Sequence, residues 1–147
     1  MKVHVLSGAV AAAFSMLLVA CATTPADDPR AAAERYQAVI ASPLRTDQDR
    51  RTDAARHPAE FLPFTQVRPG MRALDVSTGG GYTSQILALA VGPEGRLYAQ
   101  APNPGPTVRR RLEEHPQANF ILVARPFDDP VPDDARDRPA GTRCRGN

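Results

Sequence analysis

The sequence has no tryptophan, and aromatic residues make up only 5% of it. Proteins that bind single-stranded nucleic acids stack the bases on aromatic side chains, and this chain offers few of them. A basic stripe that would attract phosphates is also missing, because 18 basic and 16 acidic residues are interspersed and leave a formal net charge of +2. We therefore expect no nucleic-acid partner.

Cysteine and histidine are scarce as well. The two cysteines are Cys21 and Cys144, and the three histidines are His4, His57 and His115. None of them stands with carboxylates or with the others at the spacing that metal ligands require. The sequence thus predicts no metal site.

A disulfide between the two cysteines is conceivable in an oxidising compartment, unless Cys21 carries a lipid.

The first 20 residues have the pattern of an export signal, with Lys2 near the start, an apolar run, and then Leu18-Val19-Ala20-Cys21. The last four residues resemble the bacterial lipobox, which implies cleavage before Cys21 and attachment of a lipid to its thiol. We therefore expect a signal peptide over 1–20, a tether over 21–30, and a lipoprotein held in a membrane of the bacterial cell envelope, facing the periplasm. The alternative is an uncleaved membrane anchor, because the apolar run is barely long enough to span a bilayer.

A helical arm is predicted over 31–66. Its first helix, Arg30–Ser42, begins with helix-forming alanines and places its apolar residues at helical spacing on one face. Thr46–Arg56 is highly charged and is interpreted either as a solvated helix or as an ordered arm. Pro58–Leu62 begins a short helical turn, with proline at the first position.

Residues 67–129 show a regular alternation of strand and helix patterns, which is typical of a parallel sheet with right-handed crossovers. The expected elements are the strands Met71–Val76, Arg96–Gln100 and Asn119–Ala124 and the helices Tyr82–Val91 and Thr107–His115. The predicted fold is therefore α/β: the N-terminal half of a Rossmann-like, doubly wound parallel sheet of about three strands, preceded by the helical arm. Such strands need cover on both faces.

The pattern stops after Asp129. Residues 130–147 are rich in arginine, glycine and proline and lack the apolar fourth strand that the fold requires, so they are predicted to be a disordered tail. We expect a truncated or frame-shifted product on this basis.

The glycine turn at the end of the first predicted strand is the most informative segment. Asp75 ends the strand, Ser77–Gly81 forms the turn, and Tyr82 begins a helix. Glycine lets a ligand approach the backbone closely, and a helix N-terminus offers unpaired N–H groups, so this arrangement predicts a ligand above the strand end. Two plainer interpretations stay open: Asp75 caps the helix, or the glycines form a tight turn without a ligand.

Three segments resemble known methyltransferases. Ala73–Tyr82 resembles the first motif of the class I S-adenosylmethionine-dependent methyltransferases, and Val91–Tyr98 resembles the turn and second strand of their isoaspartyl-methyltransferase-like branch. Arg125–Asp129 is similar to a segment of predicted methyltransferases that carry lipoprotein leaders. The resemblance implies S-adenosylmethionine as the cofactor.

The resemblance also implies roles for individual residues. Asp75 would orient the amino-acid end of the cofactor, while the glycines would let the turn approach it. Gln100 stands where the family usually has an acid that holds the ribose, and Asp128 or Asp129 would face the adenine amino group. The expected cofactor-binding residues are Asp75, Ser77, Gly79, Gly80, Gly81, Tyr82, Gln100 and Asp128.

This chain departs from the family pattern at two of these positions. Ser77 replaces a glycine, which implies a tighter or differently shaped turn. Gln100 lacks the charge of the usual acid, and charge-assisted hydrogen bonds are about twice as strong as neutral ones. We therefore predict weaker cofactor binding than in a relative with an acid there, and stronger binding in Gln100→Glu.

Nucleotide-binding alternatives fit less well. Gly79-x-Gly81-x-x-Ser84 nearly matches the dinucleotide fingerprint, but Gln100 does not supply the acid that this fingerprint needs, and Asp75 would repel a pyrophosphate. No Gly-Lys-Ser/Thr follows, which excludes a nucleoside-triphosphate loop. The basic run Arg109–Arg111 is interpreted as a solvated helix face.

The sequence therefore predicts a methyltransferase-like envelope lipoprotein whose acceptor is unknown and which truncation would render inactive. We assign no catalytic residue, because in this family the acceptor pocket usually comes from later elements. A lipid-anchored, non-enzymatic binding or scaffold protein with a half-Rossmann domain is the alternative. The sequence is silent on the oligomeric state.

Overall fold

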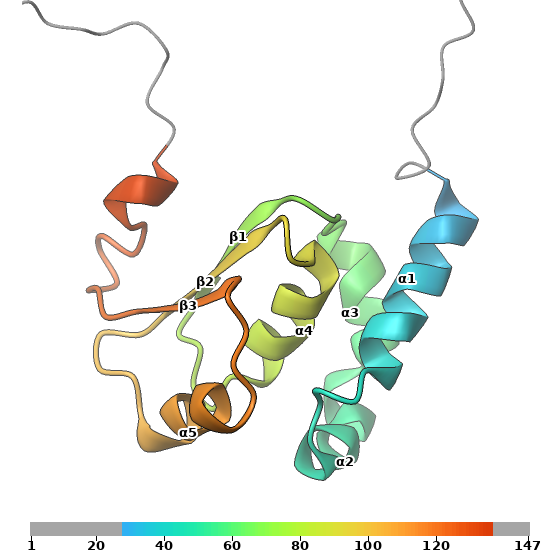
Figure 1. Ribbon diagram of the computed structural model, residues 1–147, viewed down its shortest axis with the longest axis horizontal. Coiled ribbons are helices and arrows are strands. Elements are labelled where there is room, and N and C mark those ends of the chain that lie inside the picture. Colours follow the sequence, from blue (N-terminus) through green and yellow to red (C-terminus); the bar gives the residue numbers. More distant parts are fainter. Residues whose placement is uncertain (1–27, 137–147) are drawn as a thin grey trace, which may run out of the picture.

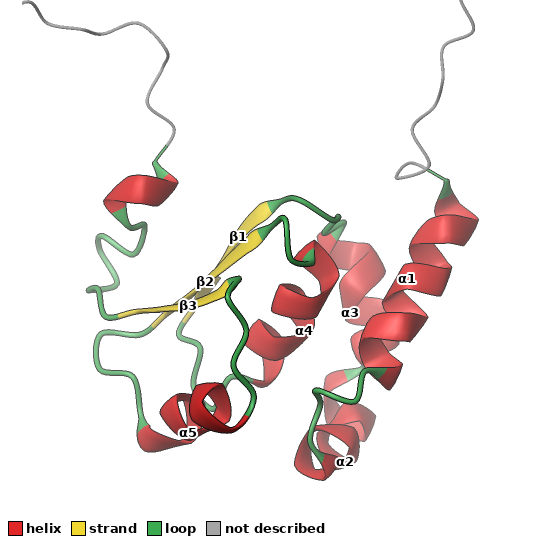
Figure 2. Cartoon of the chain, in the orientation of Figure 1, coloured by secondary structure: helices red, strands yellow, loops and turns green. Residues whose placement is uncertain are grey.

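The computed structural model describes residues 28–136. Three parallel strands form one sheet, and helices lie before and between them (Figures 1 and 2). The elements are the helices α1 (Pro29–Ala41), α2 (Asp47–Arg56), α3 (Pro58–Thr65), α4 (Tyr82–Val91) and α5 (Pro106–Glu114), the strands β1 (Arg72–Val76), β2 (Arg96–Gln100) and β3 (Phe120–Val123), and the 3-10 helix η2 (Asp133–Ala135). This arrangement confirms the predicted α/β fold.

The sheet has the strand order β1-β2-β3, and both pairings are parallel. Because side chains alternate along a strand, the register gives each face its own set of residues. Ala73, Leu97 and Phe120 pair across the sheet and belong to the hydrophobic core. Their neighbours Leu74 and Tyr98 point to the other face.

In residues 28–136, the α-helices that pack on this sheet lie on one face of it. α4 packs on all three strands, and α1 and α3 pack against each other, with α1 also contacting α4. Figure 1 shows the resulting layers, with α4 between the sheet and the pair α1 and α3. The hydroxyl of Tyr36 in α1 donates a hydrogen bond of 2.9 Å to the carbonyl of Val67, which ties α1 to the segment entering β1.

The charged segment of the arm is a helix. Thr46 caps α2 by accepting from the Asp49 amide, while the Asp49 carboxylate accepts from the Thr46 amide, so the two residues form a capping box. α3 is longer than the predicted turn and ends at Thr65, followed by Gln66 with a left-handed φ of 53°.

The other face of the sheet meets the segment after β3. The Tyr98 hydroxyl donates to an Asp134 carboxylate oxygen at 3.0 Å, and Arg72 donates to the Asp134 carbonyl. The sequence predicts a disordered tail after residue 129, whereas the structure holds residues 130–136 through these polar contacts. The sequence does not reveal them, because polar contacts of this kind produce no apolar periodicity. The predicted signal peptide and Cys21 lie outside the described residues, as do 137–147. In residues 28–136, no helix has both the length and the apolar character needed to cross a membrane.

Candidate cofactor site

The glycine turn lies at the carboxyl end of β1, as the sequence predicts. Its first residues are fastened to β2, because the Thr78 amide donates to the Gln100 carbonyl at 2.9 Å. The Gly81 amide donates to the Thr78 carbonyl at 2.9 Å, which closes the turn before α4 begins. The turn is therefore a fixed connection between a strand end and a helix start.

Asp75 points toward α4 but does not cap it. Gly81 is the N-cap residue of α4 and makes no side-chain cap, so the helix-cap interpretation of Asp75 is wrong. The Ser84 hydroxyl donates to Oδ2 of Asp75 and also bonds to the Thr78 hydroxyl. In the part of the chain that the structure describes, only Ser84 donates to this carboxylate, and it does so through Oδ2.

Burial raises the pKa of Asp75 above its ordinary value of 3.8, and the hydrogen bond from Ser84 offsets only part of this rise. Desolvation disfavours the charged carboxylate, whereas a donor to it favours the charge. A cationic group at Oδ1 would lower the pKa again.

The three glycines of the turn differ in what surrounds them. Gly79 is exposed, with φ of +56°, and a Cβ there would have only the Ser77 carbonyl within 4 Å, at 3.9 Å. Gly81 is buried, with φ of +84°, and a Cβ there would lie 3.1 Å from Val108 and 3.2 Å from Arg111. The protein itself thus fills the space beside Gly81, whereas Gly79 and Gly80 are exposed, and a Cβ on Gly80 would lie in ordinary contact with Thr107, at 3.5 Å.

Ser77 adopts a left-handed φ of 65°. This conformation costs most residues roughly 1–2 kcal/mol, and glycine adopts it freely. The turn therefore retains the backbone that the family's glycine would favour, even though a serine occupies the position.

Gln100 is fully buried and uses its amide within the protein. Its Oε1 accepts from the Ser77 amide at 3.2 Å, and its Nε2 donates to the Arg125 carbonyl. The side chain thus joins the glycine turn to the segment after β3. Its predicted contact with a ribose stays a prediction, and a glutamate there would place a carboxylate against the Arg125 carbonyl.

The two acids after β3 lie in different surroundings. Asp129 pairs with Arg125 and Arg136, and although burial alone would raise its pKa, these arginines lower it. Asp128 is exposed, and no described hydrogen bond joins it to the glycine turn. The predicted adenine contact of Asp128 therefore stays a prediction.

Tyr82 is turned toward α2. Its hydroxyl donates to Asp53 at 2.6 Å, and the guanidinium carbon of Arg45 lies 5.6 Å from the centre of its ring. Arg45 also pairs with Asp53. Burial and the nearby Asp53 carboxylate raise the pKa of Tyr82 well above its ordinary value, so this hydroxyl acts as a donor at physiological pH.

Arg111 corrects the interpretation of Arg109–Arg111 as a solvated face. Its side chain is only 11% exposed and binds the buried carboxylate of Asp49 through two hydrogen bonds of 2.7 and 2.8 Å. Arg110 does match the expectation, because its pair with Glu114 is exposed. Sequence reasoning missed Asp49 and Asp53, although acids four residues apart share one face of a helix.

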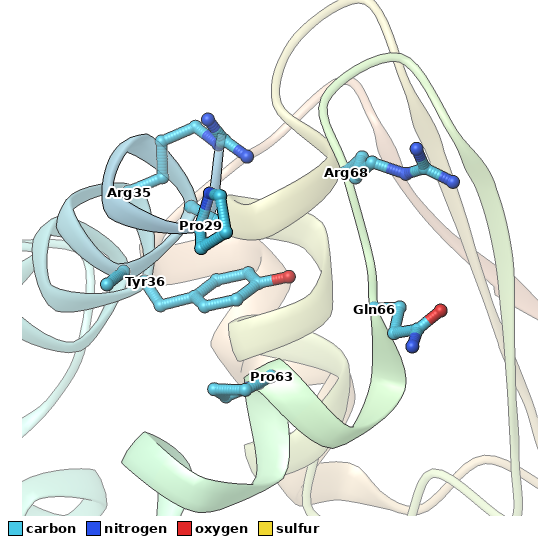
Figure 3. A pocket seen from close by; sticks show the side chains of 8 residues that line it. Pro29, Arg35, Tyr36, Pro63, Gln66 and Arg68 are labelled. Carbon is cyan, nitrogen blue, oxygen red and sulfur yellow. The ribbon is translucent and has the colours of Figure 1, made fainter. Parts of the chain in front are cut away.

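A cavity of about 430 Å³ lies away from the glycine turn, between α1 and the segment that joins α3 to β1. Figure 3 shows the ring of Tyr36 between Pro29 and Pro63, with Arg35 and Arg68 farther out. In residues 28–136, no three histidine, cysteine or acidic side chains are grouped so that they would hold a metal ion.

Comparisons with known proteins agree with the geometry of the turn. The model of the protein-L-isoaspartate(D-aspartate) O-methyltransferase (PCMT) family matches residues 22–122. The protein-L-isoaspartate O-methyltransferase of Methanothermobacter thermautotrophicus is 32% identical over 65 residues, which cover 44% of this chain and 30% of that protein. The protein of the same name from Ignicoccus hospitalis is 31% identical over 81 residues, or 54% of this chain and 38% of the relative.

The chain thus spans about a third of the length of these curated relatives. No solved structure matches it significantly. The family match covers more than half of the chain and includes the helical arm, the glycine turn and all but the end of β3. The chain belongs to the protein-L-isoaspartate(D-aspartate) O-methyltransferase family, which is part of the class I methyltransferases and uses S-adenosylmethionine as methyl donor.

Proposed function

We propose that this chain binds S-adenosylmethionine at the glycine turn and functions as a methyltransferase of the protein-L-isoaspartate type. The observation that carries the proposal is the combination of open space at Gly79 with an Asp75 carboxylate to which, in residues 28–136, only Ser84 donates, both at the end of a parallel strand. Open α/β sheets bind ligands at the carboxyl ends of their strands. A carboxylate suits the ammonium group of the donor.

The methyl donor, when bound, would supply a methyl group on a sulfonium: an acceptor oxygen would form the new bond to the methyl carbon as the carbon–sulfur bond breaks and the sulfur leaves as a neutral thioether. The names of the relatives suggest a carboxylate of an isoaspartyl residue as that acceptor. The described residues contribute orientation of the donor: Asp75 holds its amino end, and the backbone at Gly79 and Gly80 makes room for it. Such fixed positioning accounts for much of the rate gain in transfer reactions.

Substituting Gly79 tests the donor site. We expect Gly79→Ala to weaken S-adenosylmethionine binding at least about tenfold in calorimetric titration, because a single lost contact of about 1.4 kcal/mol has this effect. Gly92→Ala is the matched control, since Gly92 also has a left-handed φ, of +67°, with nothing within 4 Å of its would-be Cβ. Gly92 lies at the far end of α4, and its ψ of −178° places it in a region that is essentially restricted to glycine, so Gly92→Ala is a severe control for backbone strain. Equal affinities in the two variants would count against the site.

A non-enzymatic role is the second candidate. The packing of Arg111 and Val108 beside Gly81 favours this role, because it explains the glycine at this position by packing alone, without a ligand. Under this alternative, the wild-type protein shows no heat of binding with S-adenosylmethionine, and the same titration therefore separates the two candidates.

We also propose that the protein is a lipoprotein of the bacterial envelope, anchored through Cys21. The sequence pattern at Leu18–Cys21 supports this, and the residues concerned lie outside the described part. Intact-mass spectrometry of the protein from its native membranes is the test. We expect a chain that starts at Cys21 and carries the mass of its acyl groups; an unmodified chain would contradict the proposal.

A further inference from the structure

The arm reaches the glycine turn through one arginine of α5. Nε of Arg111 donates to the Gly80 carbonyl at 3.2 Å, while its two terminal nitrogens bind both carboxylate oxygens of Asp49 in α2. The Asp49 side chain is only 3% exposed. Arg111 therefore joins α2, α5 and the turn, and its planar, fork-shaped group suits such a bridge.

The stem of Arg111 also packs on the next residue of the turn. A Cβ on Gly81 would lie 3.2 Å from both Cδ and Nε of Arg111. One side chain thus contacts Gly80 and Gly81 at once, while Gly79 keeps open space around it. The arrangement fixes two residues of the turn and leaves the third accessible.

A second link joins α2 to the start of α4. The Tyr82 hydroxyl donates to Asp53, one helical turn after Asp49, and Arg45 donates to the other Asp53 oxygen at 3.0 Å. Figure 1 shows α2 and α5 on either side of the first turn of α4. Two acids on one face of α2 are therefore linked to the turn and the helix that follows it: Asp49 to Gly80 through Arg111, and Asp53 directly to Tyr82.

These links are the main attachment of α2 that the structure describes. Asp49 is its one buried residue in the described chain, so the helix is held by polar contacts rather than by an apolar face. Burial alone would raise the pKa of Asp49, but the hydrogen bonds from Arg111 and Thr46 hold it below its ordinary value. The pair therefore stays ionised down to acidic pH.

We propose that Arg111 and Asp49 are positioning residues that set the shape of the glycine turn for the donor, so that docking of α2 and donor binding are coupled. This inference rests on the proposed function for the donor itself. Coupling free energies are reciprocal. Docked α2 therefore favours the binding-competent turn, and bound donor protects α2.

Arg111→Lys tests the coupling, with Arg110→Lys as its matched control on the same helix. Lysine keeps the charge but cannot bind both Asp49 oxygens and the Gly80 carbonyl together. We expect about fivefold weaker S-adenosylmethionine binding, together with faster amide hydrogen exchange at Gly80–Tyr82 and in α2. Exchange in β2 should stay unchanged. Arg110→Lys should leave the affinity and all of these exchange rates as in the wild type.

The double variant Asp49→Asn with Arg111→Gln keeps the test decisive if Arg111→Lys does not fold, because it leaves no buried charge unpaired. Unchanged affinity and unchanged turn exchange in a folded variant would overturn the proposal. Equal acceleration of exchange in the turn and in β2 would do the same, since it would show a general loss of stability. If the wild type does not bind the donor, the proposed function fails, while hydrogen exchange in the turn still shows whether Arg111 and Asp49 hold its shape.

Discussion

Gly95→Ala is expected to destabilise the fold by about 3 kcal/mol or more, a large part of the stability of a small domain. A Cβ at Gly95 would lie 2.6 Å from both Cβ and the carbonyl oxygen of Val91, and 2.7 Å from the carbonyl oxygen of Met71. These obstacles are mainly backbone, and both carbonyls already accept hydrogen bonds: Val91 from Gly70 at 2.8 Å and Met71 from Arg96 at 3.0 Å. The methyl group would push apart the end of α4 and the starts of β1 and β2.

Denaturant unfolding measures this effect, and Gly105→Ala is its control. Gly105 has an ordinary φ of −72° and nothing within 4 Å of its would-be Cβ. At the N-cap of α5, where glycine is preferred to alanine, the substitution should cost only about 0.5–1 kcal/mol. If the two variants unfold at the same denaturant concentration, the close approach at Gly95 is not a structural requirement.

The parts of the fold with strong periodicity could be predicted from the sequence. α4 and β2 begin and end where the sequence places them, because Gly92–Gly95 and Gly79–Gly81 separate apolar runs of clear spacing. α2 could not be decided, since it has no apolar face. Its stability depends on a capping box and on arginines from other elements, and no local pattern reports such partners.

The candidate site was predicted less completely than the fold. The position of Asp75 and of the glycine turn at the strand end follows from local sequence. The partnership of Arg111 with Asp49 does not, because 62 residues separate them and each alone has the pattern of a solvated charge. Gln100 illustrates the same limit: family position implies a ribose contact, whereas packing uses both ends of its amide within the protein.

Asp75→Asn should change stability and donor affinity in opposite directions. The carboxyl of Asp75 has a raised pKa in the folded protein, chiefly because it is buried. The folded state therefore holds the proton more tightly than the unfolded state, and stability falls as the pH rises from the ordinary value of 3.8 through the raised pKa. At neutral pH the ionised carboxylate costs stability, and asparagine removes that cost while its oxygen still accepts from Ser84.

The same substitution removes the negative charge expected to hold the donor's ammonium group. Hydrogen bonds to charged groups contribute roughly 1.5–3 kcal/mol, so we expect binding of S-adenosylmethionine to weaken about tenfold to a hundredfold. Calorimetric titration and denaturant unfolding at pH 7 measure the two quantities, and Glu94→Gln, an exposed acid beyond α4, should change neither. A variant that loses stability and affinity together would show that the Asp75 carboxylate serves the fold. A gain in stability with lost affinity would mean that the fold tolerates a costly buried charge because the ligand needs it.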